Sequence, residues 1–151
     1  KIPFYPVPMT MQTFVVLFLG MSFGYKIGLA TVSLYLVEGI IGLPVFSNSP
    51  EKGVGLVYFT GPTMGYLIGF LFATFLAGYF DFKGNIINNF IKLIISVSTI
   101  YILGVFWLGS LIGWDKPIIH LGVTPFLLAE LFKIIILTLL AKNILKLRKF
   151  I

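Results

Sequence analysis

The chain has 151 residues, of which 58% are hydrophobic and only 11% are charged, and its formal net charge is +6. Soluble domains carry about 25% charged residues. This composition therefore excludes a soluble enzyme or a nucleic-acid-binding domain and predicts an integral membrane protein. The sequence has no cysteine and a single histidine, which excludes disulfides, cysteine nucleophiles and multi-histidine metal sites.

Five apolar stretches are long enough to cross a bilayer, because about 20 helical residues span the ~30 Å of hydrocarbon. Their apolar runs are continuous rather than alternating, which favours helices. We expect membrane-spanning helices over residues 7–24, 26–43, 62–80, 90–112 and 124–141. No linker or repeat divides the chain, so residues 1–151 are expected to form a single transmembrane domain.

The basic residues are distributed unevenly between the two sides of these spans. Seven follow the first, third and fifth spans: Lys26, Lys83, Lys92, Lys142, Lys146, Arg148 and Lys149. The opposite side carries three: Lys1, Lys52 and Lys116. Because cytoplasmic loops are enriched in Lys and Arg, we expect a multi-pass protein of the plasma membrane whose C-terminus lies in the cytoplasm.

This topology puts Lys1 outside, although no signal peptide is recognisable in the apolar region that follows it. We therefore expect one more helix before Lys1. The protein would then be a six-helix bundle whose first helix is missing from this chain and of which five helices are present. A genuine five-span protein is the alternative.

Two ionisable residues fall inside the last predicted span. Glu130 and Lys133 are three residues apart, so they share a face of the helix. A charged residue at membrane depth costs roughly 2.5–3.5 kcal/mol on insertion scales. The pair is therefore either an internal ion pair or a site that presents a carboxylate and an ammonium to a polar ligand.

Other polar residues fall at the same outer end of the predicted bundle. Glu38 is either an interfacial acid that reaches the headgroups or part of a cavity wall, and Gln12 is either a helix-start hydrogen-bonding residue or part of a site. Their shared location with Glu130 and Lys133 predicts one binding site on the external side.

The third span carries a small residue at every fourth position. Such a ladder allows another helix to approach closely; packing within the chain is the favoured interpretation, and docking of a partner membrane protein is the alternative. The ladder consists of Gly61, Gly65, Gly69, Ala73 and Ala77. No phosphate-binding loop, Ser/His/Asp set or His-Glu-x-x-His sequence is present, so we expect no ATPase activity and no catalytic residues.

Four segments, in order and in register, resemble the BioY family, the biotin-specific S components of energy-coupling factor (ECF) transporters. Residues 6–13 read PVPMTMQT, residues 35–46 read YLVEGIIGLPVF and residues 61–70 read GPTMGYLIGF. Thr124, Pro125 and Phe126, followed by Glu130 and Lys133, resemble the family's Pro-Phe…Gly-Asp-x-x-Lys motif. In this motif Lys133 matches directly, whereas a glutamate replaces the family's aspartate and Ala129 replaces its glycine.

The resemblance implies a six-helix S component in the lipid bilayer, with the vitamin bound near the external face. It also implies two kinds of partner that energise transport, the transmembrane coupling protein EcfT and two ECF ATPases. It implies biotin as ligand, without metal, cofactor or nucleic acid. We expect Glu130 to accept hydrogen bonds from the ureido ring and Lys133 to donate to a ligand oxygen, either the ureido carbonyl or the carboxylate; the opposite ligand orientation, with the polar roles exchanged, is the alternative. The further candidates are Gln12, Asn48 and Glu38 for polar contacts and Tyr35, Phe46 and Tyr66 for packing.

The sequence leaves three alternative functions, each less favoured than biotin uptake. An S component for another vitamin, such as thiamine or riboflavin, is disfavoured by the segments PMTMQ and GPT. A small structural subunit of a membrane complex would bind no ligand and would have no converging polar groups at the outer end. An intramembrane enzyme would need a catalytic set that the sequence lacks.

Overall fold

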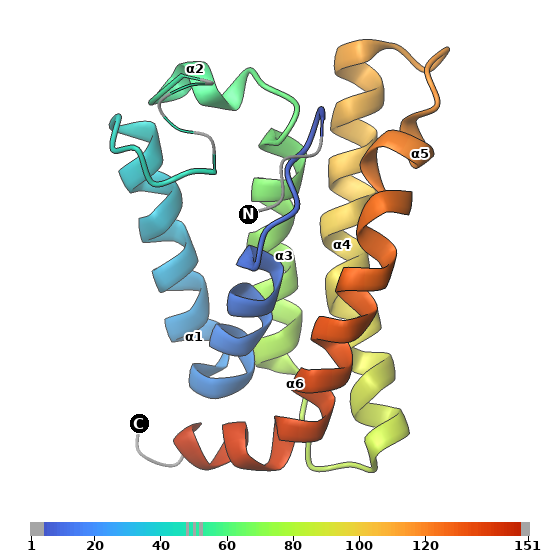
Figure 1. Ribbon diagram of the computed structural model, residues 1–151. Helices are drawn as coiled ribbons and strands as arrows, with labels where there is room; N and C mark the ends of the chain where they lie inside the picture. Colours follow the sequence, from blue (N-terminus) through green and yellow to red (C-terminus); the bar gives the residue numbers. More distant parts are fainter. Residues whose placement is uncertain (1–4, 48, 50, 52, 149–151) are drawn as a thin grey trace.

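The computed structural model describes residues 5–47, 49, 51 and 53–148, and every regular element within these ranges is helical. Figure 1 shows the long helices side by side in one bundle, with α2 and α5 at the same end of it. The elements are α1 (Gln12–Ile40), α2 (Leu56–Phe59), α3 (Met64–Tyr79), α4 (Ile86–Ile112), α5 (Ile118–Gly122), the 3-10 turn η1 (Thr124–Phe126) and α6 (Leu127–Leu147).

Helix α1 reverses its direction at Gly24. The backbone there has φ +76° and ψ 172°, a conformation that glycine adopts freely and other residues rarely do. In Figure 1 the dark blue first part of α1 descends and its light blue to cyan second part rises. A Cβ atom on Gly28 would lie 3.3 Å from Gly20 Cα. A straight helix would separate those two residues by about 12 Å. Helix α1 is therefore two antiparallel segments, residues 12–23 and 25–40.

Helix α3 is the centre of the bundle, because it packs on both α1 and α4. Its small residues make this possible. A Cβ atom on Gly69 would lie 2.6 Å from Ile100 Cα of α4, and one on Gly65 would lie 2.4 Å from Leu103 O. On the other side, a Cβ atom on Gly20 would lie 2.9 Å from the Ala77 Cβ. The predicted ladder thus faces neighbouring helices of the same chain.

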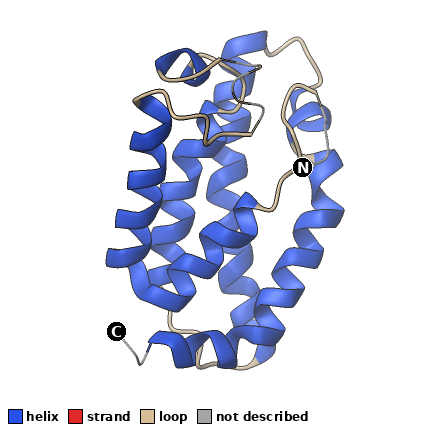
Figure 2. Ribbon diagram, turned by 60° about the vertical axis from the view of Figure 1, so that its left-hand side comes forward, coloured by secondary structure: helices blue, strands red, loops and turns tan. Residues whose placement is uncertain are grey.

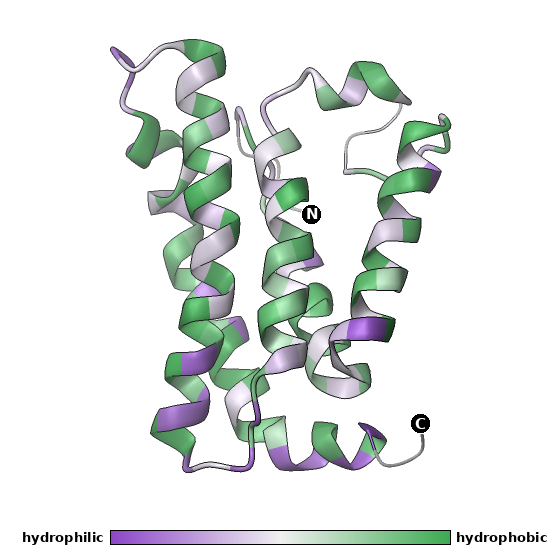
Figure 3. Ribbon diagram, turned by 180° about the vertical axis from the view of Figure 1, so that it is seen from behind, coloured by the Kyte–Doolittle hydropathy of each residue, from purple (hydrophilic) through white to green (hydrophobic). Residues whose placement is uncertain are grey.

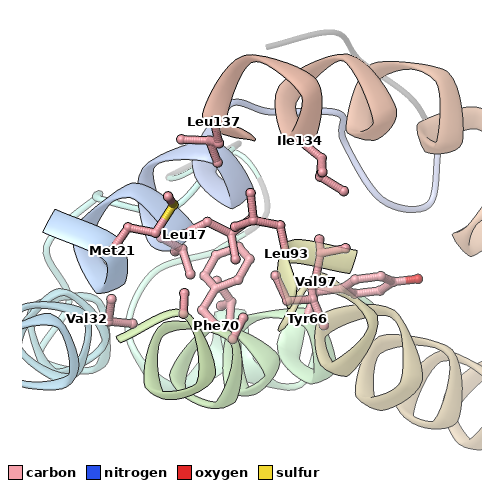
Figure 4. Packing of buried hydrophobic residues seen from close by; sticks show 14 of the residues in the cluster. Leu17, Met21, Val32, Tyr66, Phe70, Leu93, Val97, Ile134 and Leu137 are labelled. Atoms are coloured by element: carbon pink, nitrogen blue, oxygen red, sulfur yellow. The ribbon is translucent and has the colours of Figure 1, made fainter. Parts of the chain in front are cut away.

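Apolar side chains from the four long helices meet in one core. Figure 4 shows Leu17 and Met21 of α1 close to Phe70 of α3, with Leu93 of α4 and Leu137 of α6 in the same cluster. All five are 4% exposed or less. Burial of such side chains holds the helices together through close packing, as in membrane bundles generally.

The outer surface of the bundle is also apolar, as expected of a bilayer-facing protein. Phe106, Ile102 and Leu139 are 65–66% exposed, and in Figure 3 hydrophilic residues gather mostly toward the two ends of the helices. Within the described residues, Ile86–Ile112 and Ile118–Leu147 are long and apolar enough to cross a membrane. Gln12–Ile40 has the same length and composition but is divided at Gly24, and Met64–Tyr79 is a shorter apolar helix. These features indicate a multi-pass membrane protein.

The two ends of the bundle differ in their connections. The end that carries α2 and α5 is called the outer end here, and the opposite end, which carries the reversal at Gly24, the connection 80–85 and the last turns of α6, is called the inner end (Figures 1 and 2). At the outer end, the helical part of the first expected span begins only at Gln12. Pro6 and Pro8 precede it, and a proline provides no backbone N–H for a helical hydrogen bond.

We expect Gly69→Leu to destabilise the protein, because the new side chain would have to displace the backbone of α4 at Ile100. Overpacking of this kind costs about 1–3 kcal/mol, which lowers the thermal midpoint of the detergent-purified protein by several degrees. The matched control, Phe72→Leu, introduces leucine at a position of α3 that is 54% exposed and should leave the midpoint nearly unchanged. Equal midpoints for the two variants would contradict the proposed close approach of α3 and α4.

Candidate functional site

A small pocket of about 60 Å³ lies toward the outer end of the bundle. Polar side chains line one part of its wall: Thr10, Gln12, Thr13, Ser47, Tyr58, Thr63, Tyr66, Tyr101, Glu130 and Lys133. Apolar side chains line the rest: Val7, Pro8, Met9, Leu67, Phe70, Ile100 and Phe126. Such a combination of an apolar wall with a few convergent polar groups is typical of small-molecule sites.

Glu130 and Lys133 form a buried ion pair on the first turns of α6. Lys133 Nζ lies 3.5 Å from Glu130 Oε1, and the two residues are 5% and 4% exposed. Helix α6 brings them together because residues three apart lie on one face of a helix. Taking both charges out of water is costly, and it is tolerated only if further hydrogen bonds satisfy the two groups.

Lys133 obtains these bonds from the start of α1. Its Nζ donates to the carbonyl oxygen of Thr10 over 2.6 Å and to Thr13 Oγ1 over 2.9 Å. Together with the contact to Glu130, these use the three donor directions of an ammonium group. The lysine therefore has its full complement of partners within the protein.

Glu130 accepts one hydrogen bond on each carboxylate oxygen. Thr13 Oγ1 donates to Oε1 over 2.6 Å, and Tyr101 Oη, from α4, donates to Oε2 over 2.7 Å. A carboxylate offers about four acceptor positions, so Glu130 keeps acceptor capacity toward the pocket that it lines. A ligand with N–H donors would find this capacity available.

A second group of hydrogen bonds holds Gln12 at the pocket wall. Thr10 Oγ1 donates to Gln12 Oε1 over 2.9 Å, and Gln12 Nε2 donates to Tyr35 Oη. The ring of Tyr35 packs edge-on against Phe46, with centroids 5.2 Å apart. Phe46 also contacts the rings of Tyr58 and Phe59 at 4.8 and 5.4 Å. These aromatic rings join α1, α2 and the segment between them behind the pocket.

The outer side of the pocket is held by tyrosines. Tyr66 Oη donates to the Gly122 carbonyl over 2.9 Å, and Tyr58 Oη donates to the Ser47 carbonyl over 2.6 Å. Burial raises the pKa of the Tyr58 phenol above its ordinary value, which keeps the hydroxyl protonated as a donor. By contrast, Ser47 Oγ is buried and has no hydrogen-bond partner among the described residues.

The sequence-predicted residues take different places. Gln12, Tyr66, Glu130 and Lys133 line the pocket. Tyr35 and Phe46 lie behind it and support Gln12 and the segment before α2, and Glu38 lies near the end of α1 and does not line the pocket. Asn48 lies outside the described residues.

Thr10, Thr13, Ser47 and Tyr101 line the pocket but are not among the site residues selected from the sequence. A signal was present for three of them. Thr10 and Thr13 flank Gln12 within the segment PMTMQT, and Tyr101 is a hydroxyl-bearing residue in the middle of a long apolar helix. No pattern singles out Ser47.

We expect Lys133→Met to destabilise the protein by about 3–5 kcal/mol, because it leaves the Glu130 carboxylate buried without a counter-charge. Adding Glu130→Gln to this variant should recover a large part of the loss, since the uncompensated charge is then removed. The thermal unfolding of both variants can be followed through the fluorescence of Trp107 and Trp114. Additive losses in the double variant would contradict energetic coupling between the two residues.

Comparison with known proteins identifies the family. A family model described as the BioY family matches residues 1–150. The probable biotin transporter BioY of Pyrococcus horikoshii is 34% identical over 139 residues, which cover 92% of this chain and 81% of that protein. The biotin transporter BioY of Thermotoga maritima is 35% identical over 148 residues, which cover 97% of this chain and 86% of that protein.

A solved structure agrees with these sequence matches. The crystal structure at 2.1 Å of the S-component for biotin from an ECF-type ABC transporter superposes with a TM-score of 0.78 and 27% identity, covering 95% of this chain and 78% of the other. The resemblance inferred from the four sequence segments is confirmed. The chain belongs to the BioY family.

Proposed function

We propose that this protein is a biotin-binding S component that mediates biotin uptake, with the ligand held in the pocket beside Glu130 and Lys133. The observation that supports this most strongly is the buried ion pair at the outer end of the bundle. Relatives that cover most of the chain are named biotin transporters. The protein acts as a transport subunit rather than as an enzyme.

The ureido ring of biotin has two N–H donors and a carbonyl oxygen, and its thiolane is apolar. Glu130 accepts from the ureido N–H groups, since its carboxylate has acceptor positions left beside Thr13 and Tyr101. A ligand oxygen takes the place of the weakest partner of Lys133, which is Glu130 Oε1 at 3.5 Å. The thiolane packs on the apolar wall formed by Leu67, Phe70 and neighbouring residues.

Biotin requires a larger pocket than the present space of about 60 Å³. Sites for small molecules have volumes of about 300–1,000 Å³. The non-helical walls, residues 7–10 and residues 43–47, are the parts that can move without breaking a long helix. Their outward displacement opens the site, and their return encloses the ligand.

Transport is energised by other proteins. The structural neighbour is the S-component of an ECF-type ABC transporter, and we infer that an EcfT-type coupling protein and ECF ATPases provide the energy from ATP. The chain supplies five long helical segments of a six-helix S-component bundle, since α1 contributes two. Its C-terminus lies in the cytoplasm, in accordance with the Lys and Arg residues at the inner end.

The test is equilibrium binding of labelled biotin to the detergent-purified protein, with thiamine and riboflavin as competitors. We expect binding that unlabelled biotin alone displaces. We further expect Lys133→Ala to weaken it at least about tenfold, since charge-assisted hydrogen bonds contribute about 1.5–3 kcal/mol each.

The control variant is Lys116→Ala, an exposed lysine of the outer end beside Asp115 that does not line the pocket. Its affinity should equal that of the unsubstituted protein. No biotin binding by a folded sample would refute the proposed ligand. Unchanged affinity in folded Lys133→Ala would refute the proposed site.

Ser47 provides an independent test of the pocket. Its buried hydroxyl has no partner among the described residues, so Ser47→Ala should leave the thermal midpoint unchanged. If biotin bonds to this hydroxyl, the variant loses about 0.5–1.5 kcal/mol of binding free energy, which is about a two- to tenfold rise in Kd. A lower midpoint with an unchanged Kd would show that Ser47 acts in folding instead.

A further inference from the structure

A second cleft, far from the pocket, opens at the inner end of the bundle between the end of α3 and the last turns of α6. It has a volume of about 650 Å³. Aromatic residues Tyr79, Phe80 and Phe82 form one wall, and basic residues of α6 form the other. Figures 1 and 2 both show the last turns of α6 crossing beneath the bundle, which brings them under α1 and α3.

The cleft is strongly cationic. Four basic residues line it against a single acid, Asp81, among its described residues: Lys83, Lys142, Lys146 and Arg148. Asp81 is within 3.6 Å of Lys83, so the charge of that lysine is already balanced. Lys142 and Lys146, one helical turn apart on α6, have no carboxylate within ion-pair distance in the part of the chain that the structure describes.

Arg148 holds this wall in place. Its Nη2 donates to the Gly78 carbonyl at the end of α3, and a Cβ atom on Gly24 would lie 2.9 Å from the same nitrogen. The end of α6 is therefore tied to the end of α3 and to the reversal of α1. These contacts fix the last turns of α6, and the burial of Ala141 and Ile144 on the same turns leaves Lys142 and Lys146 on the exposed side of the helix.

An exposed aromatic stripe leads from the cleft along the bilayer-facing side of α3. Phe72, Phe75 and Tyr79 are 54%, 38% and 68% exposed. The rings of Phe75 and Tyr79 are stacked, with centroids 5.8 Å apart and planes 17° apart. Tyr79 also lines the cleft, so the cationic surface and the apolar stripe meet at this residue.

We propose that this cleft binds the phosphate-bearing headgroup of an anionic membrane lipid, whose acyl chain lies along Phe72 and Phe75. Basic pockets between helices at the cytoplasmic membrane surface bind anionic headgroups, with about 1 kcal/mol contributed by each Lys or Arg near that surface. A soluble phosphate ester offers the same charge but no group for the stripe. The position of the stripe favours the lipid over the soluble ester.

The experiment measures lipid retention by the detergent-purified protein in native mass spectrometry, without biotin. The probes are dioleoyl-phosphatidylglycerol, dioleoyl-phosphatidylcholine and soluble glycerol 3-phosphate. We expect one phosphatidylglycerol to be retained in preference to phosphatidylcholine, with millimolar glycerol 3-phosphate unable to displace it. The double variant Lys142→Gln/Lys146→Gln should weaken retention about tenfold or more, and added salt should weaken it further.

The matched control is Lys26→Gln, which removes an exposed lysine of the same end of the bundle that does not line the cleft. It should retain phosphatidylglycerol as the unsubstituted protein does. Equal retention of the two lipids, or equal loss in the control and the double variant, would overturn the proposal in favour of a diffuse charge effect. Complete displacement by glycerol 3-phosphate would overturn it in favour of a soluble ligand.

Discussion

The buried pair of Glu130 and Lys133 is the constraint on which the outer half of the structure depends. Two charges 4–5% exposed in an apolar bundle need partners in every direction. The partners come from elements distant in sequence: Thr10 and Thr13 at the start of α1 and Tyr101 in α4. The pair therefore determines where three elements meet, and the pocket forms at that meeting point.

Close helix packing positions the helices that carry the pocket residues. Gly69 allows α3 to approach α4, and the reversal at Gly24 returns α1 to the outer end, where Tyr35 holds Gln12. A bulkier residue at either glycine would move a helix that carries a pocket residue. The small residues of α3 thus act on the site through the positions of the helices and not through contact with a ligand.

The sequence was sufficient to predict the helical membrane architecture and the polar pair, because continuous apolar runs and charges within them are local signals. It was sufficient for the family because four segments carry the family's motifs in order. It could not reveal Thr13 and Tyr101 as partners of Glu130, since those contacts join residues 117 and 29 positions apart. Nor could it separate Tyr66, which lines the pocket, from Tyr35, which supports Gln12 behind it. Both are tyrosines in apolar helices, and only packing distinguishes them.

The hydrogen bonds of the pair also limit what the pocket can bind. Lys133 has all its donor directions in use, so a ligand oxygen must displace one existing partner, and the carboxylate at 3.5 Å is the weakest. Displacement would leave Glu130 with less compensation for its buried charge unless the same ligand brings N–H donors. A ligand with a carboxylate alone fails this condition, whereas a cyclic urea meets it with one group. The pocket therefore favours a ligand that offers an oxygen acceptor to Lys133 and N–H donors to Glu130 at the same time.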